Sequence, residues 1–429
     1  MNLSSEAVNG EAAASALALA SNARPCPLCG RQSAERLAEI DCALFDGCSL
    51  ERPVRLLACP DCGLVYSEID DPSSLARYYH EQAAYGAHDL GPGSGGDSLL
   101  ERRRYGRSYE ALANFLAGPE TQIIDLGCAN GGFLFYLRDQ GFTDLTGVDL
   151  SRPCLEYLAA HGFGVLFGGA EHIPLPDSSV DLVYSSNLFE HLYDLAAAAL
   201  EVRRVLRPGG LFFVEAPDSR DYDGCCLKGQ EWLIPEHINF LSRGHLEELL
   251  KLTGFSILGA GPNRIYFTES HYQPSTYVLG RKTGPDGVDY PVVHRPLREQ
   301  VSRRLAEDAG RRAKAQNLVA KLASEGRGLY LWGLGLTFSF FYAQLDWSRA
   351  DIKALVDRRP SVQNQTFQGR EVRGLEALAE AGPDDAVLAF ATRSSGMKDY
   401  LAEINFQGLF FNLADGLDTL ETNEQPRRI

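Results

Sequence analysis

Three things are scarce in this chain of 429 residues: long apolar runs, basic charge and cysteine. No stretch of about 18 uncharged apolar residues occurs, which excludes a membrane-spanning helix. Lysine and arginine together number 41 against 57 aspartates and glutamates, so the formal net charge is −16. A surface this acidic repels nucleic-acid phosphates and anionic lipid. We therefore expect no nucleic acid and no membrane among the partners, and a cytoplasmic location.

Near the N-terminus, the Ala- and Leu-rich segment Ala12–Ala20 is the one stretch that resembles a targeting signal. Secretory signals begin with a basic segment, whereas Glu6 and Glu11 precede this one. We therefore expect no signal peptide and interpret residues 1–22 as a flexible leader.

The ten cysteines are too few for a disulfide scaffold, but six of them lie between Cys26 and Cys62. Cys26-Pro-Leu-Cys29-Gly and Cys59-Pro-Asp-Cys62-Gly are two copies of one C-x2-C turn. Each turn directs two thiolates toward one point, and its glycine can adopt a positive φ. Four thiolates complete a tetrahedral site with no open position, which is typical of structural zinc. The sequence therefore predicts a structural Zn²⁺ site formed by Cys26, Cys29, Cys59 and Cys62.

Iron is the alternative metal, because the paired turns also resemble those of rubredoxin. Nothing else in the sequence indicates electron transfer, so zinc is favoured and iron stays open. Cys42 and Cys48 lack the C-x2-C spacing and are interpreted as spare thiols. Cys225-Cys226 is interpreted as an ordinary reduced pair.

The length predicts about three domains, at roughly 150 residues each. Apolar runs alternate with helical patterns from Gln122 to about Gly280, which is typical of a parallel, doubly wound sheet. A charged, Ala-rich helical stretch follows, and a second α/β pattern begins at Gly328. The predicted elements are a helix over Leu99–Leu116 and strands over Ile123–Leu126, Leu145–Asp149, Val180–Tyr184, Leu211–Ala216, Gly328–Trp332, Ile352–Asp357 and Ala386–Ala391.

Residues 123–133, Ile-Ile-Asp-Leu-Gly-Cys-Ala-Asn-Gly-Gly-Phe, predict a strand, a tight glycine turn and a helix. Small residues let the backbone approach a ligand closely, and the helix offers free N–H groups to an anionic group. The next strand ends at Asp149, 22 residues after Gly127, where a carboxylate can accept both ribose hydroxyls. The turn and the acid together indicate a cofactor that contains a ribose.

Four blocks, in this order, resemble the class I S-adenosylmethionine-dependent methyltransferases: DLGCANGGF at 125–133, GVDLS at 147–151, IPLPDSSVDLVYSSNLFEHL at 173–192 and LRPGGLFFVEAPD at 206–218. The resemblance covers residues from about 100 to 260. It implies a class I methyltransferase Rossmann-like α/β fold with S-adenosyl-L-methionine as cofactor. The cofactor-binding residues that it implies are Asp125, Gly127 and Gly131 at the methionine moiety, Asp149 at the ribose, Ala170 and Glu171 at the adenine, and Asn187 beside the sulfonium, together with Ala129 and Leu150.

Two positions depart from the family pattern. Ala129 stands where many relatives have a middle glycine, and Gly169 stands where they often have an aspartate near the adenine amino group. Glu171 is a candidate substitute for that aspartate. A nicotinamide cofactor in the same glycine turn is the alternative interpretation.

Methyl transfer from a sulfonium is an in-line displacement, so the protein mainly aligns donor and acceptor. A hydroxyl or an acidic carbon must also lose a proton, and histidine is suited to accept it near neutral pH. Glu190-His191 follows one predicted strand, and Glu236-His237 precedes a predicted helix that begins near Arg243. We predict His237, Glu236 and His191 as catalytic residues. The alternative for either histidine is a structural role, as a helix cap or as a partner of a backbone carbonyl.

The layout of the whole chain resembles bacterial sugar C-methyltransferases that act on nucleotide-linked deoxysugars. This resemblance implies zinc in the cysteine turns, a base at Glu236-His237, and a sugar pocket lined by tyrosines, here Tyr78, Tyr79 and Tyr85. The predicted function is C- or O-methylation of a nucleotide-linked sugar in surface-polysaccharide or natural-product biosynthesis. The alternatives are an O- or N-methyltransferase acting on another natural-product scaffold, a nicotinamide-dependent oxidoreductase, and a binding protein that has lost its chemistry.

The last part of the chain begins as another Rossmann-like fold, with a glycine turn after Trp332 and an acid at Asp357. Phe338 follows Thr337 where a full dinucleotide fingerprint has a small residue, so a role in scaffolding or in cradling the substrate is favoured over NAD binding. The predicted divisions are a leader (1–22), a zinc-binding module with a substrate-lid segment (23–98), a methyltransferase domain (99–280), a helical connector (281–325) and a C-terminal Rossmann-like domain (326–429).

Overall fold

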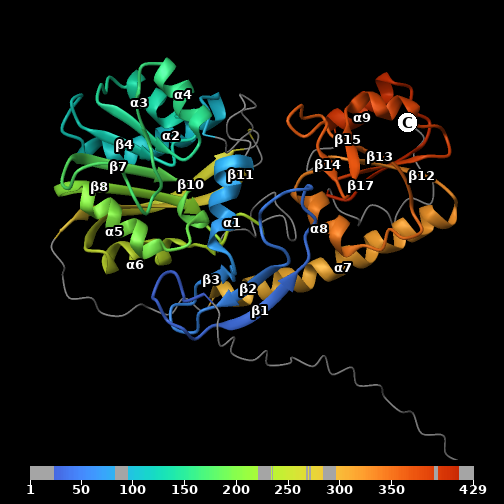
Figure 1. The fold of residues 1–429 in the computed structure, drawn as a ribbon, viewed down its shortest axis with the longest axis horizontal. Coiled ribbons are helices and arrows are strands. Elements are labelled where there is room, and N and C mark those ends of the chain that lie inside the picture. Colours follow the sequence, from blue (N-terminus) through green and yellow to red (C-terminus); the bar gives the residue numbers. More distant parts are fainter. Residues whose placement is uncertain are drawn as a thin grey trace, which may run out of the picture.

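The computed structural model contains three β-sheets, each with its own helices (Figure 1). Tyr85, Cys225 and Cys226 lie outside the part of the chain that the structure describes. The described residues are 24–82, 95–220, 233, 235–266, 269, 272–283, 296–390 and 395–414.

The middle domain is built on a seven-stranded sheet in the order β10-β11-β8-β7-β4-β5-β6. β4 lies at the centre of five parallel strands, between β5 and β7. Ligands of doubly wound sheets bind where the strand order reverses in this way. The strands are β4 (Ile123–Leu126), β5 (Leu145–Asp149), β6 (Gly164–Phe167), β7 (Val180–Ser186), β8 (Leu206–Pro217), β10 (Phe255–Tyr266) and β11 (Tyr272–Lys282), and the helices are α2 (Leu99–Leu112), η3 (Ala113–Phe115), α3 (Gly132–Asp139), α4 (Arg152–Ala160), η4 (Phe189–His191), α5 (Leu195–Val205) and α6 (Arg243–Leu252).

The predicted parallel arrangement is confirmed for these five strands, and β4 and β5 have the predicted bounds. At one edge the sheet differs from the predicted parallel arrangement, because β10 and β11 form an antiparallel hairpin whose second strand pairs with β8. The helix expected over Leu99–Leu116 is shorter, since α2 ends at Leu112 and a 3₁₀ turn follows.

The N-terminal module is a four-stranded antiparallel sheet in the order β1-β2-β3-β9. Its last strand comes from the segment between β8 and α6, so that Val65 pairs with Phe240 and Tyr66 with Asn239. The module is therefore completed by two residues from far along the chain. Its elements are β1 (Glu35–Ile40), β2 (Val54–Ala58), β3 (Val65–Ser67), α1 (Pro72–Arg77), the π-helical turn η1 (Tyr78–Gln82) and β9 (Asn239–Phe240).

The C-terminal domain has a six-stranded sheet in the order β14-β15-β13-β12-β16-β17, parallel except for the β14–β15 pair. Its first strand lies between its second and a later one, so the Rossmann-like prediction fits this topology. Its elements are α7 (Pro296–Ser324), β12 (Gly328–Trp332), α8 (Leu336–Gln344), β13 (Asp351–Val356), β14 (Thr366–Phe367), β15 (Arg370–Arg373), η7 (Leu375–Glu380), β16 (Ala386–Ala389), α9 (Ser395–Glu403) and β17 (Leu409–Asn412).

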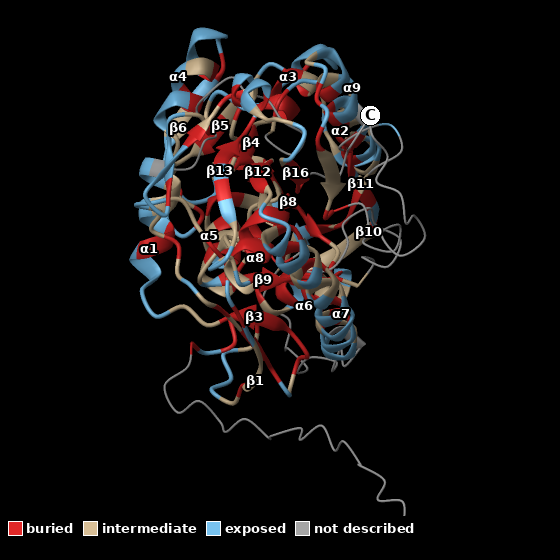
Figure 2. Ribbon diagram, turned by 90° about the vertical axis from the view of Figure 1, so that its right-hand side faces the viewer, coloured by how far each residue is buried: buried red, intermediate tan, exposed pale blue. Residues whose placement is uncertain are grey.

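The N-terminal module shares buried cores with both of its neighbours, and Figure 1 shows it beneath and between the two α/β domains. Tyr66, Cys26, Cys59 and Cys62 of the module belong to the same apolar cluster as Leu126 and Phe189 of the middle domain. On the other side, Ala43 packs into the core of the C-terminal domain and exchanges backbone and side-chain hydrogen bonds with Ser339. Buried residues gather on the sheets in Figure 2.

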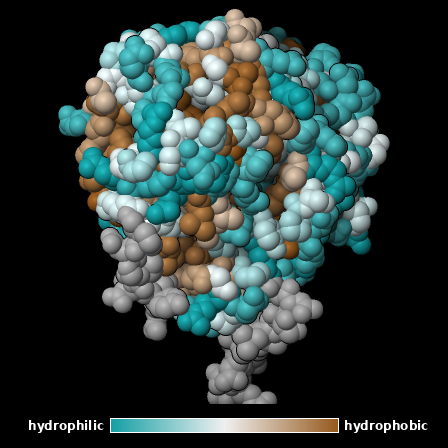
Figure 3. All heavy atoms as spheres, turned by 60° about the vertical axis from the view of Figure 1, so that its left-hand side comes forward, coloured by the Kyte–Doolittle hydropathy of each residue, from teal (hydrophilic) through white to brown (hydrophobic). Residues whose placement is uncertain are grey.

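The surface in Figure 3 is largely hydrophilic, and hydrophobic side chains show between the hydrophilic ones. Of the helices in the described ranges, none combines the length and the apolar character needed to cross a lipid bilayer.

Candidate active site

The glycine turn after β4 has an unusual backbone, because Gly127, Ala129 and Gly131 have positive φ angles of 74°, 44° and 69°. The N–H groups of Gly127 and Cys128 donate to the carbonyl of Val148 at 2.8 and 3.2 Å, which fixes the turn against β5. Gly131 is the N-cap of α3 and provides no side-chain cap. The turn therefore presents backbone, with little side chain, at the carboxyl edge of the sheet.

Gly131→Ala is expected to lower the free energy of unfolding by about 2–3 kcal/mol, since overpacking adds to left-handed strain. A Cβ atom at this position would lie 2.3 Å from Cδ2 of Leu158. Gly141→Ala is the matched control, because Gly141 has φ of 94° and nothing within 4 Å of its Cβ position. Urea denaturation should show a loss of only about 1 kcal/mol in the control. Equal losses would mean that Leu158 moves aside and the close contact does not matter.

Asp149, at the end of β5, accepts hydrogen bonds from backbone N–H groups on both carboxylate oxygens. Oδ2 accepts from Ala129 at 2.8 Å, and Oδ1 accepts from Ser151 at 2.7 Å. A carboxylate oxygen has a second lone pair, so each can still accept a hydroxyl hydrogen. Burial raises the pKa of Asp149, while the backbone N–H groups lower it. The carboxylate is therefore held in one orientation and retains the capacity to bind a diol such as that of ribose.

Two further polar groups border the same turn. Burial raises the pKa of Asp125 to about 8, with Asp149 adding to the effect and Arg104 opposing it. Asn187, directly after β7, adopts a left-handed φ of 56°, and its Oδ1 atom is buried without a hydrogen-bond partner among the described residues. An orphaned buried amide oxygen beside a close-approach glycine turn fits a bound polar cofactor such as S-adenosyl-L-methionine.

The segment expected near adenine lies at the end of β6. Ala170 is buried, Glu171 is exposed, and Leu150 faces Gly169, about 4 Å from the position its Cβ would occupy. Phe167 is 38% exposed, and the guanidinium of Arg152 and the ring of His80 lie against it. The structure therefore places apolar and aromatic groups on this side of the site.

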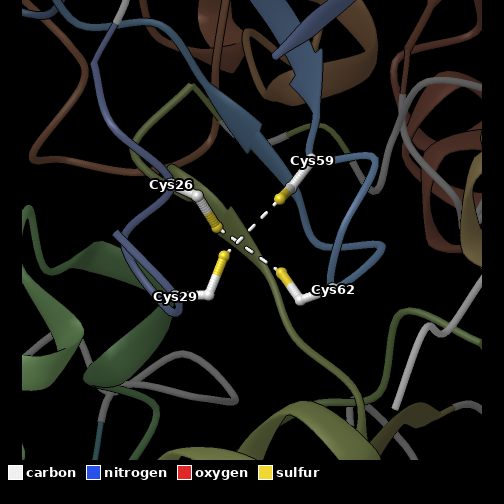
Figure 4. Close-up of side chains that lie close together, drawn as sticks. All are labelled: Cys26, Cys29, Cys59 and Cys62. Atoms are coloured by element: carbon white, nitrogen blue, oxygen red, sulfur yellow. Dashed lines mark hydrogen bonds between the residues drawn. The ribbon is translucent and has the colours of Figure 1, made fainter. Parts of the chain in front are cut away.

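The four cysteines of the two turns converge with their sulfur atoms facing one another (Figure 4). The Sγ atoms of Cys26 and Cys62 are 3.5 Å apart, and those of Cys29 and Cys59 are 3.6 Å apart. Four sulfurs at about 2.3 Å from one zinc ion lie about 3.8 Å apart, so the set fits a tetrahedral site. Gly30 and Gly63 have φ angles of 70° and 76°, as the turn requires. The spare-thiol interpretation of Cys42 and Cys48 agrees with their places outside this cluster.

Glu190, His191 and His237 form a second cluster, in which one donor atom of each lies within 4.8 Å of the others. The rings of His191 and His237 meet edge to face with centroids 4.7 Å apart. Nε2 of His191 lies 3.8 Å from Oε1 of Glu190. Two segments about 45 residues apart therefore meet at the carboxyl edge of β7.

Backbone contacts hold these two segments together. The N–H of Ile238 donates to the carbonyl of Glu190 at 2.8 Å, and Nδ2 of Asn239 donates to the carbonyls of Phe189 and Leu192 at 3.0 and 2.7 Å. The buried guanidinium of Arg24 also donates to the carbonyl of Leu192 and to Oδ1 of Asn239. Sequence analysis missed Asn239 and Arg24, because nothing in either residue's neighbourhood marks a contact so distant in sequence.

The tautomer of His191 follows from its partners. Nδ1 lies 3.0 Å from the backbone carbonyl of Glu236 and 2.7 Å from the hydroxyl of Tyr79. A carbonyl can only accept, so Nδ1 carries a hydrogen and the lone pair of the neutral ring is on Nε2. Glu236, predicted as a catalytic residue, thus contacts His191 through its backbone carbonyl.

The ionisation of the cluster is shifted by burial. Burial lowers the pKa of His237 well below its usual value, and His191 lowers it further. Burial also raises the pKa of Glu190 to about 7, against the opposing effect of His191. His237 is therefore a neutral imidazole at neutral pH, which is the form that can accept a proton.

The tyrosine segment reaches this cluster from the N-terminal module. Tyr79 contacts His191 through its hydroxyl, and the ring of Tyr78 packs on Tyr79 with centroids 5.3 Å apart. The structure thus brings together His191, His237, Tyr79 and the carbonyl of Glu236, while Tyr85 lies outside the described residues.

Residues 124–214 match the family described as "Methyltransferase domain". The middle domain therefore has the Rossmann-like α/β fold of class I methyltransferases. A protein named as a probable S-adenosylmethionine-dependent methyltransferase of Mycolicibacterium smegmatis is 32% identical over 158 residues, which are 36% of this chain and 59% of that protein. The malonyl-[acyl-carrier protein] O-methyltransferase of Serratia marcescens is 32% identical over 136 residues, or 31% of this chain and 51% of that protein. The chain thus spans about half the length of the curated relatives that the methyltransferase domain matches.

Among solved structures, an S-adenosylmethionine-dependent methyltransferase from Mesorhizobium loti is similar to 41% of this chain and 97% of its own, with 22% identity and a TM-score of 0.35.

Proposed function

We propose that this protein transfers a methyl group from S-adenosyl-L-methionine to a small-molecule acceptor. The observation that carries this proposal is the position of the Glu190–His191–His237 cluster. It lies just beyond β7, and Asn187 directly follows the same strand. A cofactor cradle and a neutral histidine at one sheet edge are the two parts that methylation of a protonated acceptor needs.

The residues of the cofactor site have separable roles. Asp149 binds the ribose hydroxyls, the turn from Gly127 to Gly131 holds the methionine moiety against its backbone, and Asn187 offers its unpaired Oδ1. When bound, S-adenosyl-L-methionine supplies an electrophilic methyl group. His237 accepts the proton that the acceptor loses, so that an electron pair becomes available for in-line attack.

The acceptor that we propose is a nucleotide-linked sugar, methylated at carbon or oxygen. The whole-chain layout supports this class, together with Tyr79, whose hydroxyl projects beside His191. A carboxylate acceptor is the second candidate, because a relative is named for O-methylation of a malonyl group. The two classes differ in chemistry, since a carboxylate is already deprotonated at neutral pH and needs no base.

Asp149→Ala is expected to weaken binding of S-adenosyl-L-methionine about a hundredfold, because it removes two charge-assisted hydrogen bonds to the ribose. Isothermal titration calorimetry measures this directly. Asp357→Ala is the matched control, because Asp357 occupies the corresponding place in the C-terminal domain, where Arg359 and the N–H of Leu334 bind its carboxylate. Undiminished binding in the Asp149 variant, or no binding in the parent protein, would contradict the proposed cofactor site.

A further inference from the structure

Glu190 has a buried carboxylate that lies close to the ring of His191. It is 2% exposed, and neither of its oxygens has a hydrogen-bond partner on another residue of the described chain. The nearest group that can carry a proton toward it is Nε2 of His191, at 3.8 Å. A buried carboxylate without a hydrogen bond is costly, so this side chain needs either a proton of its own or a cation beside it.

His191 can provide that proton in only one place. Its Nδ1–H is committed to the carbonyl of Glu236, so any further proton on the ring must be on Nε2, the atom that faces Glu190. The ring of His237 lies too close to the ring of His191 for both to carry a positive charge, because their centroids are 4.7 Å apart. Two imidazolium rings at that separation repel each other in a poorly hydrated site.

We propose that Glu190 is a positioning residue that forms a coupled pair with His191. The pair holds a single proton, either on the carboxylate of Glu190 or on Nε2 of His191, so that this proton stays on the pair and His237 remains neutral. The role of the pair in methyl transfer rests on the proposed function; the shared proton itself does not. The charged or titratable groups around Glu190 are His191 on its own turn, His237 before β9, Glu215 on β8 and Arg104 on α2. Tyr79 on η1 contacts His191.

The first experiment needs no turnover. In protein labelled with ¹³C at the glutamate carboxyl carbon, the Glu190 signal is assigned by its absence from the isosteric Glu190→Gln variant. It should titrate with a pKa of about 7. In His191→Asn the same signal should titrate at higher pH, because the neighbour that favours the carboxylate is gone. Titration at the ordinary glutamate value, or no change in His191→Asn, would overturn the shared proton.

The second experiment separates positioning from a purely structural role. Glu190→Gln should lower kcat about tenfold or more near pH 6 and progressively less at higher pH, with KM and cofactor affinity unchanged, because the displaced proton then competes for His237. Glu190→Asp should recover part of the rate. Glu248→Gln is the control, since Glu248 is a similarly buried glutamate on α6 with a raised pKa. An even loss across the pH range would overturn the proposal.

Two remaining outcomes are distinguishable from these. If Mn²⁺ broadens the Glu190 signal at stoichiometric concentration, the cluster binds a cation and the shared proton is overturned. If the carboxyl titrations behave as expected but the parent protein methylates no acceptor, the proposed function fails while the proton sharing between Glu190 and His191 stands.

Discussion

Replacing Cys62 with serine should remove the bound metal, lower the melting temperature by more than roughly 10 °C and abolish methyl transfer. Structural zinc contributes about 10–16 kcal/mol of binding free energy, which is comparable to the whole stability of a domain at about 5–15 kcal/mol. The four Sγ atoms converge from two turns that are far apart in the sequence (Figure 4). Metal analysis, together with a thermal melt followed by circular dichroism, measures both effects.

The loss should extend to methyl transfer because the N-terminal module positions the cluster of Glu190, His191 and His237. β3 follows the second cysteine turn and pairs with β9, which begins two residues after His237. Arg24, two residues before the first cysteine turn, binds Asn239 and the carbonyl of Leu192. The separation between His191 and His237 therefore depends on the folded module, whereas the turn between Gly127 and Gly131 lies on another sheet.

Cys48→Ser is the matched control for this prediction. Cys48 belongs to the same module, is partly buried and lies outside the metal cluster. Its replacement should change the free energy of unfolding by less than about 1 kcal/mol and leave the metal content intact. Retention of the metal in Cys62→Ser would contradict the four-thiolate site. The same metal analysis distinguishes iron from zinc. If it finds iron, the predicted ion is wrong, whereas the four predicted cysteine ligands are not affected.

The predictable parts of the fold are those that depend on a local sequence pattern. β4 and β5 are short apolar runs that end in an acid or a glycine turn, and both have the predicted bounds. β9 is only two residues long, and its partner β3 lies far away in the sequence, since Val65 pairs with Phe240. No local pattern therefore indicates a strand at this position. The β10–β11 hairpin is hard to recognise in the sequence because β10 contains Gly259, Gly261 and Pro262. These residues are poor strand formers, and the pairing of β10 with β11 overrides their preference.

The candidate site shows the same division. Each Glu-His pair could be recognised from its type and its position after a predicted strand or before a helix. That the two pairs meet depends on the N–H of Ile238 and the side chain of Asn239, which contact the turn around Glu190. The sequence also could not show that Glu236 contacts His191 through its backbone carbonyl, because residues of every type have this group.

His237→Gln should lower the rate of methyl transfer to a protonated acceptor by about a hundredfold or more, with the affinity for S-adenosyl-L-methionine unchanged. Glutamine retains much of the volume and polarity of histidine but cannot accept the proton. Single-turnover kinetics with a nucleotide-linked sugar, together with calorimetry of cofactor binding, measure the two quantities. His161→Gln is the control, because His161 is an exposed histidine at the end of α4. An unchanged rate would exclude His237 as the base.

The same substitution should change how stability depends on pH. In the unfolded chain an imidazole binds a proton below a pH of about 6.5, whereas burial and His191 keep the pKa of folded His237 well below that value. Between these two pKa values the unfolded state binds more protons, so the parent protein loses stability as the pH falls. Above pH 7 His237 is neutral in both the folded and the unfolded protein, and it no longer makes the stability depend on pH. Urea denaturation should therefore show that His237→Gln gains stability relative to the parent as the pH falls below about 6. A difference in the free energy of unfolding that stays constant between pH 8 and pH 5 would mean that His237 titrates normally in the folded protein.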